Sequence, residues 1–204
     1  MKRLNKKGFT LIELLAVIII LGVLLLIAVP SVSKYITESR MDTYKTNLTR
    51  LVDAVSNEVN SYSGEYSFRS DEFLIIPLVC IEVEKGSNTK SPFGLYEHAN
   101  SFVAVTRKYA TDSEGNSTGV PTGFKYYVAA LDENGFGATM EDLQSANFKV
   151  SGEPKLTTIE VDTAATQTTP ATYKLTGTNI PSAFTTDIAG KTGKLITCDA
   201  YNAG

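Results

Sequence analysis

The chain has few of the residue types that usually carry enzymatic or metal chemistry. Its 204 residues include one histidine, two cysteines and no tryptophan. A single histidine, His98, excludes a histidine-rich metal site, and no G-x-S-x-G, H-E-x-x-H or glycine-rich phosphate-binding motif is present. The formal net charge of −3 is not that of a protein that coats nucleic acid. We therefore predict a protein that is not an enzyme and that has no metal site and no cofactor.

A long apolar run near the N-terminus is the strongest feature of the sequence. From Phe9 to Val29 only Thr10 and Glu13 are polar. As a helix at about 1.5 Å per residue this run is roughly 31 Å long, which matches a bilayer core of about 30 Å. A cleaved secretory signal has a shorter apolar region and a small-x-small cleavage site, and this run has neither. Four basic residues precede it and predict a cytoplasmic N-terminus: Lys2, Arg3, Lys6 and Lys7.

Glu13 lies inside this apolar run and needs a partner. Insertion scales place the cost of an acidic residue near the centre of a membrane helix at about 2.5–3.5 kcal/mol. One candidate partner is local, because Thr10 and Glu13 have the T-x-x-E spacing of a capping box. The other candidate is a cation. If the chain is cut after Gly8, Phe9 gains a free amine, and the amine of a neighbouring chain can reach Glu13 better than its own.

The stretch "KKGFTLIELLAVIIILGVLLLIAVP", from Lys6 to Pro30, closely resembles the N-terminus of type IV pilins and the related type II secretion pseudopilins. The resemblance implies that residues 1–8 are a class III leader, which a prepilin peptidase removes between Gly8 and Phe9. It also implies N-methylation of Phe9 and pairing of Glu13 with the N-terminus of a neighbouring subunit during assembly.

The resemblance implies a single-pass prepilin in the plasma membrane that later enters an extracellular filament. Its partners would be other pilin subunits, the prepilin peptidase and methyltransferase, and the assembly platform with its ATPase. The filament would serve adhesion, surface motility, aggregation or DNA uptake. Two alternatives stay open: a pseudopilin of a type II secretion or competence system, and a membrane-tethered binding protein that never polymerises.

The same helix is expected to continue past Pro30 to about Ser63. Residues 9–30 would form its apolar transmembrane or filament-core part, and residues 31–63 its amphipathic part. Apolar residues recur there at steps of three and four: Met41, Tyr44, Leu48, Leu51, Val52, Val55, Val59 and Tyr62. Pro30 is expected to bend the helix. Gly22 either allows close packing or local melting, or is simply a small residue in a membrane helix.

Residues 64–204 are predicted to form one β-rich head, so that the fold class is α+β with an antiparallel sheet packed on the long helix. Strand-like runs start at Ser101 and Gly123, with turns at Gly115–Asn116, Pro121–Gly123 and Asn134–Gly135. A hairpin is expected from Thr157 onward. "LIIPLVCIEV" is expected to be buried in the connection between helix and sheet, and "KLITCDA" to form the last strand. "KSPFG" resembles the turn before the first sheet strand of Gram-positive pilins and pseudopilins, which implies the same place for it in this chain.

Cys80 and Cys198 either form one disulfide or remain two buried free thiols. A disulfide would close a loop of more than a hundred residues, to which the chain-entropy model assigns about 4.7 kcal/mol. Many pilins close a C-terminal loop with a disulfide, but the spacing in this sequence is much wider than in that arrangement.

Overall fold

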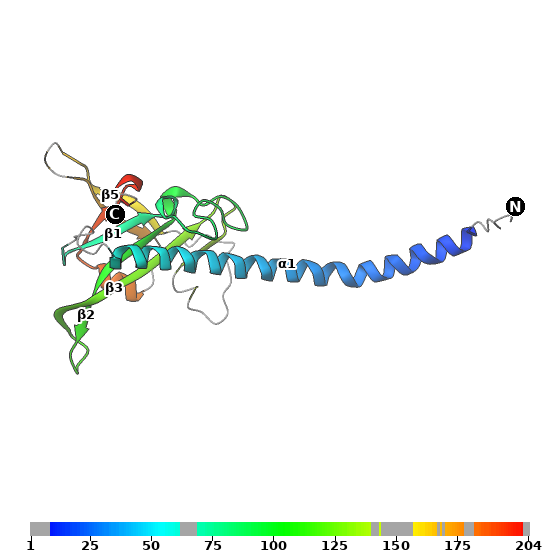
Figure 1. The fold of residues 1–204 in the computed structure, drawn as a ribbon, viewed down its shortest axis with the longest axis horizontal. Helices are drawn as coiled ribbons and strands as arrows, with labels where there is room; N and C mark the ends of the chain where they lie inside the picture. The colour runs from blue at the N-terminus through cyan, green and yellow to red at the C-terminus, as the bar shows by residue number, and fades with distance from the viewer. Residues whose placement is uncertain are drawn as a thin grey trace. The chain divides into compact units, whose positions relative to one another are not determined.

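The computed structural model describes residues 9–61, 69–139, 143, 157–166, 168, 170–177 and 182–201 (Figure 1). The chain divides into two compact units, Met1–Arg40 and Met41–Gly204. The boundary lies inside the first helix, just before the first helical side chains that become buried. The second unit therefore contains the last part of that helix together with the head.

The first helix, α1, spans Leu11–Ser61 and confirms the long helix that the sequence predicts. Pro30 lies inside it without ending it. Its buried residues repeat at helical spacing along one face: Tyr44, Asn47, Leu48, Leu51, Val52, Val55 and Val59. Asn47 was not expected in this stripe. The predicted end at Ser63 and the predicted buried position of Tyr62 lie outside the described residues.

A seven-stranded sheet forms the centre of the head, with the order β4-β3-β2-β1-β7-β6-β5. Its strands are β1 (Glu72–Pro77), β2 (Phe102–Thr111), β3 (Ser117–Leu131), β4 (Gly137–Thr139), β5 (Thr157–Thr163), β6 (Thr172–Gly177) and β7 (Thr192–Leu195). All neighbouring pairs are antiparallel except β1 and β7, which are parallel. The α+β architecture is confirmed, and the expectation of a purely antiparallel sheet is corrected at this one pair.

Most of the segment "LIIPLVCIEV" is buried as expected, but it is not a connection. Its first part belongs to β1, the middle strand of the sheet, and a 3-10 turn, η1 (Leu78–Cys80), follows. Phe73, Leu74, Ile75 and Ile76 are all at most 1% exposed, because β1 has strands on both edges and side chains packed on both faces. A continuous apolar run is what such a doubly covered strand requires.

The end of the chain also differs from the prediction. "KLITCDA" was expected to be one strand, whereas β7 ends at Leu195 and a short helix, α4, spans Cys198–Tyr201. A further helix, α3 (Ser182–Ile188), precedes β7 and was not predicted. The "KSPFG" segment precedes β2 and not the first strand, because β1 comes before it in the chain. The hairpin expected from Thr157 is confirmed as β5 and β6.

The sheet separates two apolar clusters that alternate along each strand. On one face, Leu74, Val103 and Val128 pack with the buried stripe of α1. On the other face, Ile75, Ala104 and Tyr127 pack with α3, whose Phe184 ring stacks on Tyr127 at 4.2 Å. Alternation with period two sends neighbouring residues of a strand to opposite faces, and this explains the split.

The strands β2 and β3 extend as a two-stranded ribbon beyond the rest of the sheet (Figure 1). Strand β1 pairs with β2 only from Phe102 to Val105, while β2 and β3 stay paired as far as Thr111 and Ser117. Pro121 lies inside β3, which corrects the predicted turn at Pro121–Gly123. The ladder accommodates this proline with register shifts at Tyr109, where a missing N–H donor costs least.

Candidate functional site

The described chain begins at Phe9, and Thr10 and Glu13 form a capping box at the start of α1. The carboxylate oxygen Oε2 of Glu13 accepts hydrogen bonds from the Thr10 backbone N–H at 2.8 Å and the Thr10 hydroxyl at 2.9 Å. The Glu13 N–H donates to the Thr10 hydroxyl at 3.3 Å. Thr10, the local one of the two partners considered for Glu13, therefore binds its carboxylate in the single chain. A carboxylate has acceptor capacity for further donors, so the cap does not exhaust it.

The apolar part of α1 is exposed all around. Every large apolar side chain from Phe9 to Val29 is between 49% and 93% exposed, and α1 contains a window that is long and apolar enough to cross a membrane with none of it buried. Exposing one such side chain to water instead of burying it costs about 1.5–3 kcal/mol. Contact with lipid or with other protein chains would remove this cost.

Gly22 and Pro30 both lie inside this exposed part. A Cβ built on Gly22 meets no atom within 4 Å, so nothing in the single chain requires a glycine there. Close packing against another chain, or local melting, stays a prediction for this position, as does a bend at Pro30. The predicted cleavage after Gly8 concerns residues 1–8, which lie outside the described part of the chain.

In the head, a disulfide joins Cys80 to Cys198, with an S–S distance of 2.08 Å and a separation of 118 residues. It connects η1 to α4. Cys80, Ile81, Ile196 and Tyr201 belong to the same apolar cluster as the buried face of α1. The disulfide therefore ties the C-terminal segment to the side of the head that covers the helix.

Asp132 is the one fully buried carboxylate among the described residues, and its contacts are structural. Its Oδ1 accepts from the N–H groups of Asn134 and Phe136, and its Oδ2 accepts from the Ser91 hydroxyl at 2.6 Å. These bonds hold the turn between β3 and β4 against the loop before β2. Burial, and secondarily the charge of Asp132, raises the pKa of the nearby Tyr96.

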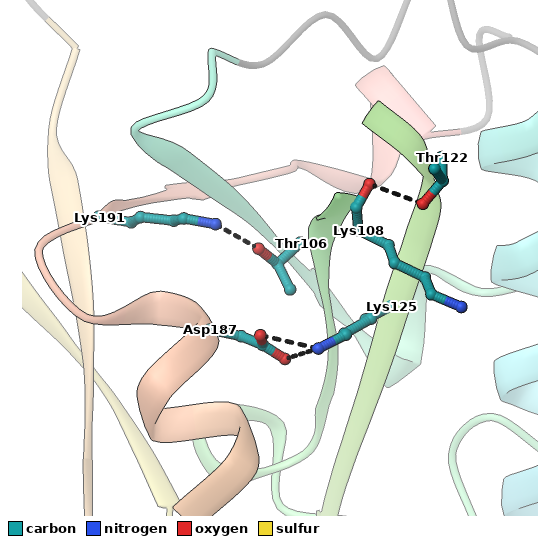
Figure 2. A network of polar contacts seen from close by, with 6 residues as sticks. All are labelled: Thr106, Lys108, Thr122, Lys125, Asp187 and Lys191. Carbon is teal, nitrogen blue, oxygen red and sulfur yellow. Dashed lines mark hydrogen bonds and ion pairs between the residues drawn. The ribbon is translucent and has the colours of Figure 1, made fainter. Parts of the chain in front are cut away.

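A polar network connects α3 and β7 to the base of the ribbon (Figure 2). Lys125 on β3 bonds both carboxylate oxygens of Asp187 on α3 at 2.8 Å. Lys191, just before β7, donates to the buried Thr106 hydroxyl at 2.9 Å, and its amino group lies 5.8 Å from the centre of the Tyr109 ring. Burial lowers the pKa of Lys191.

This network anchors the ribbon and does not form a pocket for an anion. In Figure 2 the amino group of Lys108 points away from Asp187, so the lysines do not converge on one point. The residue pairs are 62 and 85 positions apart in the sequence. No short-range sequence signal could have predicted them, because the tertiary fold alone brings them together.

An open apolar groove of about 430 Å³ lies at the end of the sheet where β1 and β7 end. Its walls combine residues of η1, η2 (His98–Asn100), β5, β6 and the segment after β7. They are Pro77, Val79, Cys80, His98, Ala99, Ile159, Tyr173, Leu195, Ile196, Thr197 and Cys198. The groove was not predicted from the sequence, because its walls come from five separate segments.

No group of three or more His, Cys, Asp or Glu side chains within the described ranges could hold a metal ion. The described side chains pack, cap α1 and form ion pairs. The features available for recognition are the exposed apolar helix, the ribbon and the groove.

Comparisons with known proteins concern the N-terminal part of the chain. Residues 3–29 match the family model of the prokaryotic N-terminal methylation motif. The chain is also 33% identical over 63 residues to the ComG operon protein 3 homolog of Bacillus licheniformis. This alignment covers 31% of the chain and 61% of that relative, so it spans less than two thirds of the relative's length. No solved structure matches the chain.

Proposed function

We propose that this chain, a member of the type IV pilin and pseudopilin superfamily, is a structural subunit that is cut after Gly8 and polymerises through its N-terminal helix. Before assembly, the helix would anchor the prepilin in the plasma membrane. After assembly, the same apolar surface would lie in the core of an extracellular filament. The processing enzyme would be a prepilin peptidase that also methylates Phe9.

The exposed apolar half of α1 carries this proposal. All side chains from Leu11 to Val29 are exposed in the single chain, and Glu13 is the one polar residue among them. A surface that is apolar on every side is satisfied equally by lipid and by a dry bundle of identical helices. Moving a subunit from the membrane into such a bundle would thus change the hydrophobic free energy little, which suits a polymer that grows from the membrane.

Glu13 would then have two roles, one in the monomer and one in the polymer. In the monomer its carboxylate caps α1 through Thr10. In the polymer we propose that it also pairs with the methylated amine of Phe9 in a neighbouring subunit, because both charged groups are costly in an apolar core and neutralise each other. This pairing would set the register between successive subunits.

Between a pilus and a shorter pseudopilin fibre, we favour a pilus subunit. The 63 aligned residues make up 61% of the ComG relative but only 31% of this chain, so the relative is about half as long (31/61). A large head with a long ribbon gives the filament more surface for adhesion, motility, aggregation or DNA uptake. The pseudopilin alternative is supported by the ComG similarity itself.

Mass spectrometry of filaments sheared from cells that express the full chain tests the proposal. The expected result is a polymer whose subunits begin at methylated Phe9 and whose Cys80–Cys198 disulfide is intact. Subunits that retain residues 1–8 in a polymer, or an uncut monomer found only in membranes, would contradict it. A short fibre that stays within the cell envelope would favour the pseudopilin alternative.

Two substitutions at one position separate the two roles of Glu13. Glutamine can still accept the Thr10 bonds of a capping box, whereas alanine cannot. If charge pairing matters, Glu13→Gln and Glu13→Ala should both be processed normally and both lose most of the filament yield. If capping is the whole role, Glu13→Gln should assemble like the unmodified chain. Filament yield from sheared cells, set against processed monomer on a gel, gives the answer.

A further inference from the structure

The charged side chains in the amphipathic part of α1 favour one spacing. From Ser31 to Ser61 they are Lys34, Glu38, Arg40, Asp42, Lys45, Arg50, Asp53 and Glu58. Four pairs are eight residues apart, and all four join opposite charges: Lys34 with Asp42, Asp42 with Arg50, Lys45 with Asp53, and Arg50 with Glu58. No other spacing joins as many pairs. The next most frequent spacing, five residues, joins only like charges: Arg40 with Lys45, Lys45 with Arg50, and Asp53 with Glu58.

Opposite charges at a spacing of eight are not placed to pair within one helix. Spacings of three and four residues bring side chains of the same helix together. An ion pair that α1 does form, between Lys34 and Glu38 at 3.8 Å, has the spacing of four. Eight residues cover about 12 Å of helix and about 80° beyond two full turns. Two parallel copies of the helix, shifted by eight residues, would place each of these charges beside its opposite.

The side of α1 that carries these charges remains accessible after the head has folded. Asp42, Arg50 and Asp53 are exposed and Lys45 is half-buried, while the buried stripe faces the sheet. Lys34, Asp42 and Lys45 lie within about 80° of one another around the helix. Arg50 is about 140° around from Lys45. One neighbouring helix can therefore meet the first three pairs but not the pair of Arg50 with Glu58.

An open groove of about 420 Å³, which we call the charged groove, lies beside the same stretch of α1. Its walls come from α1 and from the segment after η1: Arg50, Asp53, Ala54, Asn57, Glu82, Val83, Glu84 and Lys85. Glu82 and Glu84 add negative charge beside Asp53, and Lys85 adds a second cation to Arg50. The charged groove is therefore suited to a partner that presents both a lysine and an acid.

We propose that α1 of a second copy, parallel to the first and shifted by eight residues, lies along the charged groove. Lys45 of the second copy faces Asp53, and Asp42 of the second copy faces Arg50. Next to the groove, Lys34 of the second copy faces Asp42. The inference rests on the proposed function and deepens it, because it sets the register of helices whose apolar parts are already bundled. The shift corresponds to about 12 Å along the helix.

The occupant is a second copy because the chain supplies both sets of charges at the matching spacing. Each copy offers Lys45 to one neighbour and Asp53 to another, so the contact is heterologous and repeats along the polymer. It is also continuous with the bundle of apolar helices that the proposed function requires. A subunit in a bundle has several neighbours, so this contact and the pairing of Glu13 can involve different copies.

A charge exchange between Lys45 and Asp53 tests the contact. Neither residue has a second charge at this spacing, since Thr37 and Ser61 occupy those positions. Lys45→Glu and Asp53→Lys each place like charges together at every contact, so the filament yield of either variant should fall about tenfold or more. The variant that carries both substitutions restores opposite charges between copies and should recover most of the yield.

The matched control is Arg40→Glu, which reverses an exposed charge of the same helix. Val32 and Leu48 lie eight residues to either side of it, so no charge pair is lost and filament yield should equal that of the unmodified chain. All variants should be processed normally, because none lies near Gly8. Urea midpoints of the detergent-solubilised monomers show whether any loss of filaments comes from an unfolded head.

The double variant also separates this contact from pairing inside one helix. Lys45 lies three residues from Asp42, and Asp53 lies three residues from Arg50, so each could serve a local pair. The double variant reverses one charge in both local pairs. If local pairing were the role of these residues, the double variant should assemble worse than either single variant. The contact between copies requires that it assemble better.

Cysteine cross-linking measures the register directly. Filaments of Lys45→Cys/Asp53→Cys, treated with a short bifunctional thiol reagent, should give a ladder of covalent multimers on a denaturing gel. Each copy can then link to one neighbour through position 45 and to another through position 53, while Cys80 and Cys198 remain joined to each other. Lys45→Cys/Thr49→Cys, which matches a shift of four residues, should give far fewer multimers.

The outcomes separate this inference from the proposed function. If filaments form but the double variant assembles no better than the single variants, the contact is wrong and the pilin-type function stands. A ladder from the cysteine pair at 45 and 49 in place of the pair at 45 and 53 would also overturn the contact. If the unmodified chain forms no polymer, the proposed function fails and the contact fails with it.

Discussion

From Leu11 to Arg40 the helix α1 has no buried residue, whereas from Met41 to Ser61 it has seven. The backbone is continuous across this change, so secondary structure does not distinguish the two parts. What differs is the source of the covering surface. The second part carries its own cover in the same chain, the sheet, whereas the first part has none in the single chain.

The largest expected effect comes from matched leucine truncations in the two parts of α1. Leu48 is fully buried against the sheet, whereas Leu24 is 57% exposed. Leu48→Ala should lower the free energy of unfolding of the head by about 2–5 kcal/mol, because it leaves a cavity. Leu24→Ala should leave it unchanged. Urea unfolding of the detergent-solubilised full chain, followed by near-ultraviolet circular dichroism, measures both. Equal losses would mean that the head also depends on the exposed part.

Removing the disulfide should affect only the covered part. Replacing Cys80 and Cys198 by serine opens a loop with a sequence separation of 118 residues. We expect the head to lose about 2–4 kcal/mol of unfolding free energy, while membrane insertion of the apolar part stays normal. Comparing urea midpoints with the extent of membrane extraction separates the two. An unchanged midpoint would show that packing alone holds α4 and η1 in place.

Gly22→Ala should produce a smaller effect and reveal what covers the exposed part. The added methyl group meets open space in the single chain, and alanine favours a helix by about 1 kcal/mol. Helix content of the monomer in detergent should therefore be equal or slightly higher. If neighbouring helices pack closely at Gly22, filament yield should nevertheless fall. Normal yield would support the alternative that Gly22 is only a small residue in a membrane helix.

The smallest effect concerns the exposed ribbon. Hydrogen bonds from the Asn116 N–H and then from the Glu114 N–H lower the pKa of Asp112. Its folded pKa lies below the unfolded value, so this contribution to stability is present above about pH 4 and is lost as the pH falls through the folded pKa. The amide signals of Glu114 and Asn116 should shift at a pH below that of an ordinary aspartate. Asp112→Asn should remove this titration and leave the head core intact.

Sequence patterns predicted the long helix, its buried stripe, β2, β3 and the β5–β6 hairpin, because each follows from a local period or turn signal. They did not predict β1 as the middle strand. An apolar run such as "LIIPLV" fits a buried strand or a buried connection equally well, and only its neighbours decide. The strand character of Pro121 was missed for a related reason, since the register of the β2–β3 ladder shifts on either side of Tyr109, the residue that pairs with the proline, and this irregularity accommodates it.

In the candidate site, too, the features that arise from residues close in the sequence were predicted, and those that join distant segments were not. Thr10 and Glu13 are three residues apart, so their capping box could be read from spacing alone. By contrast, the walls of the groove come from five segments, and the bonds from Lys125 to Asp187 and from Lys191 to Thr106 connect distant parts of the chain. The pairing of Cys80 with Cys198 could be named as one of two options, but their proximity depends on where η1 and α4 lie.

By itself, the sequence determined that this protein has an apolar helix with an acid near its start and a methylation-type leader motif, because helix period, hydropathy and capping act over a few residues. Only the tertiary structure decided that β1 and β7 run parallel, that a ribbon projects from one end of the sheet and that a groove opens at the other. Those features arise from contacts between residues far apart in the chain, whose free energies exist only once the sheet has formed.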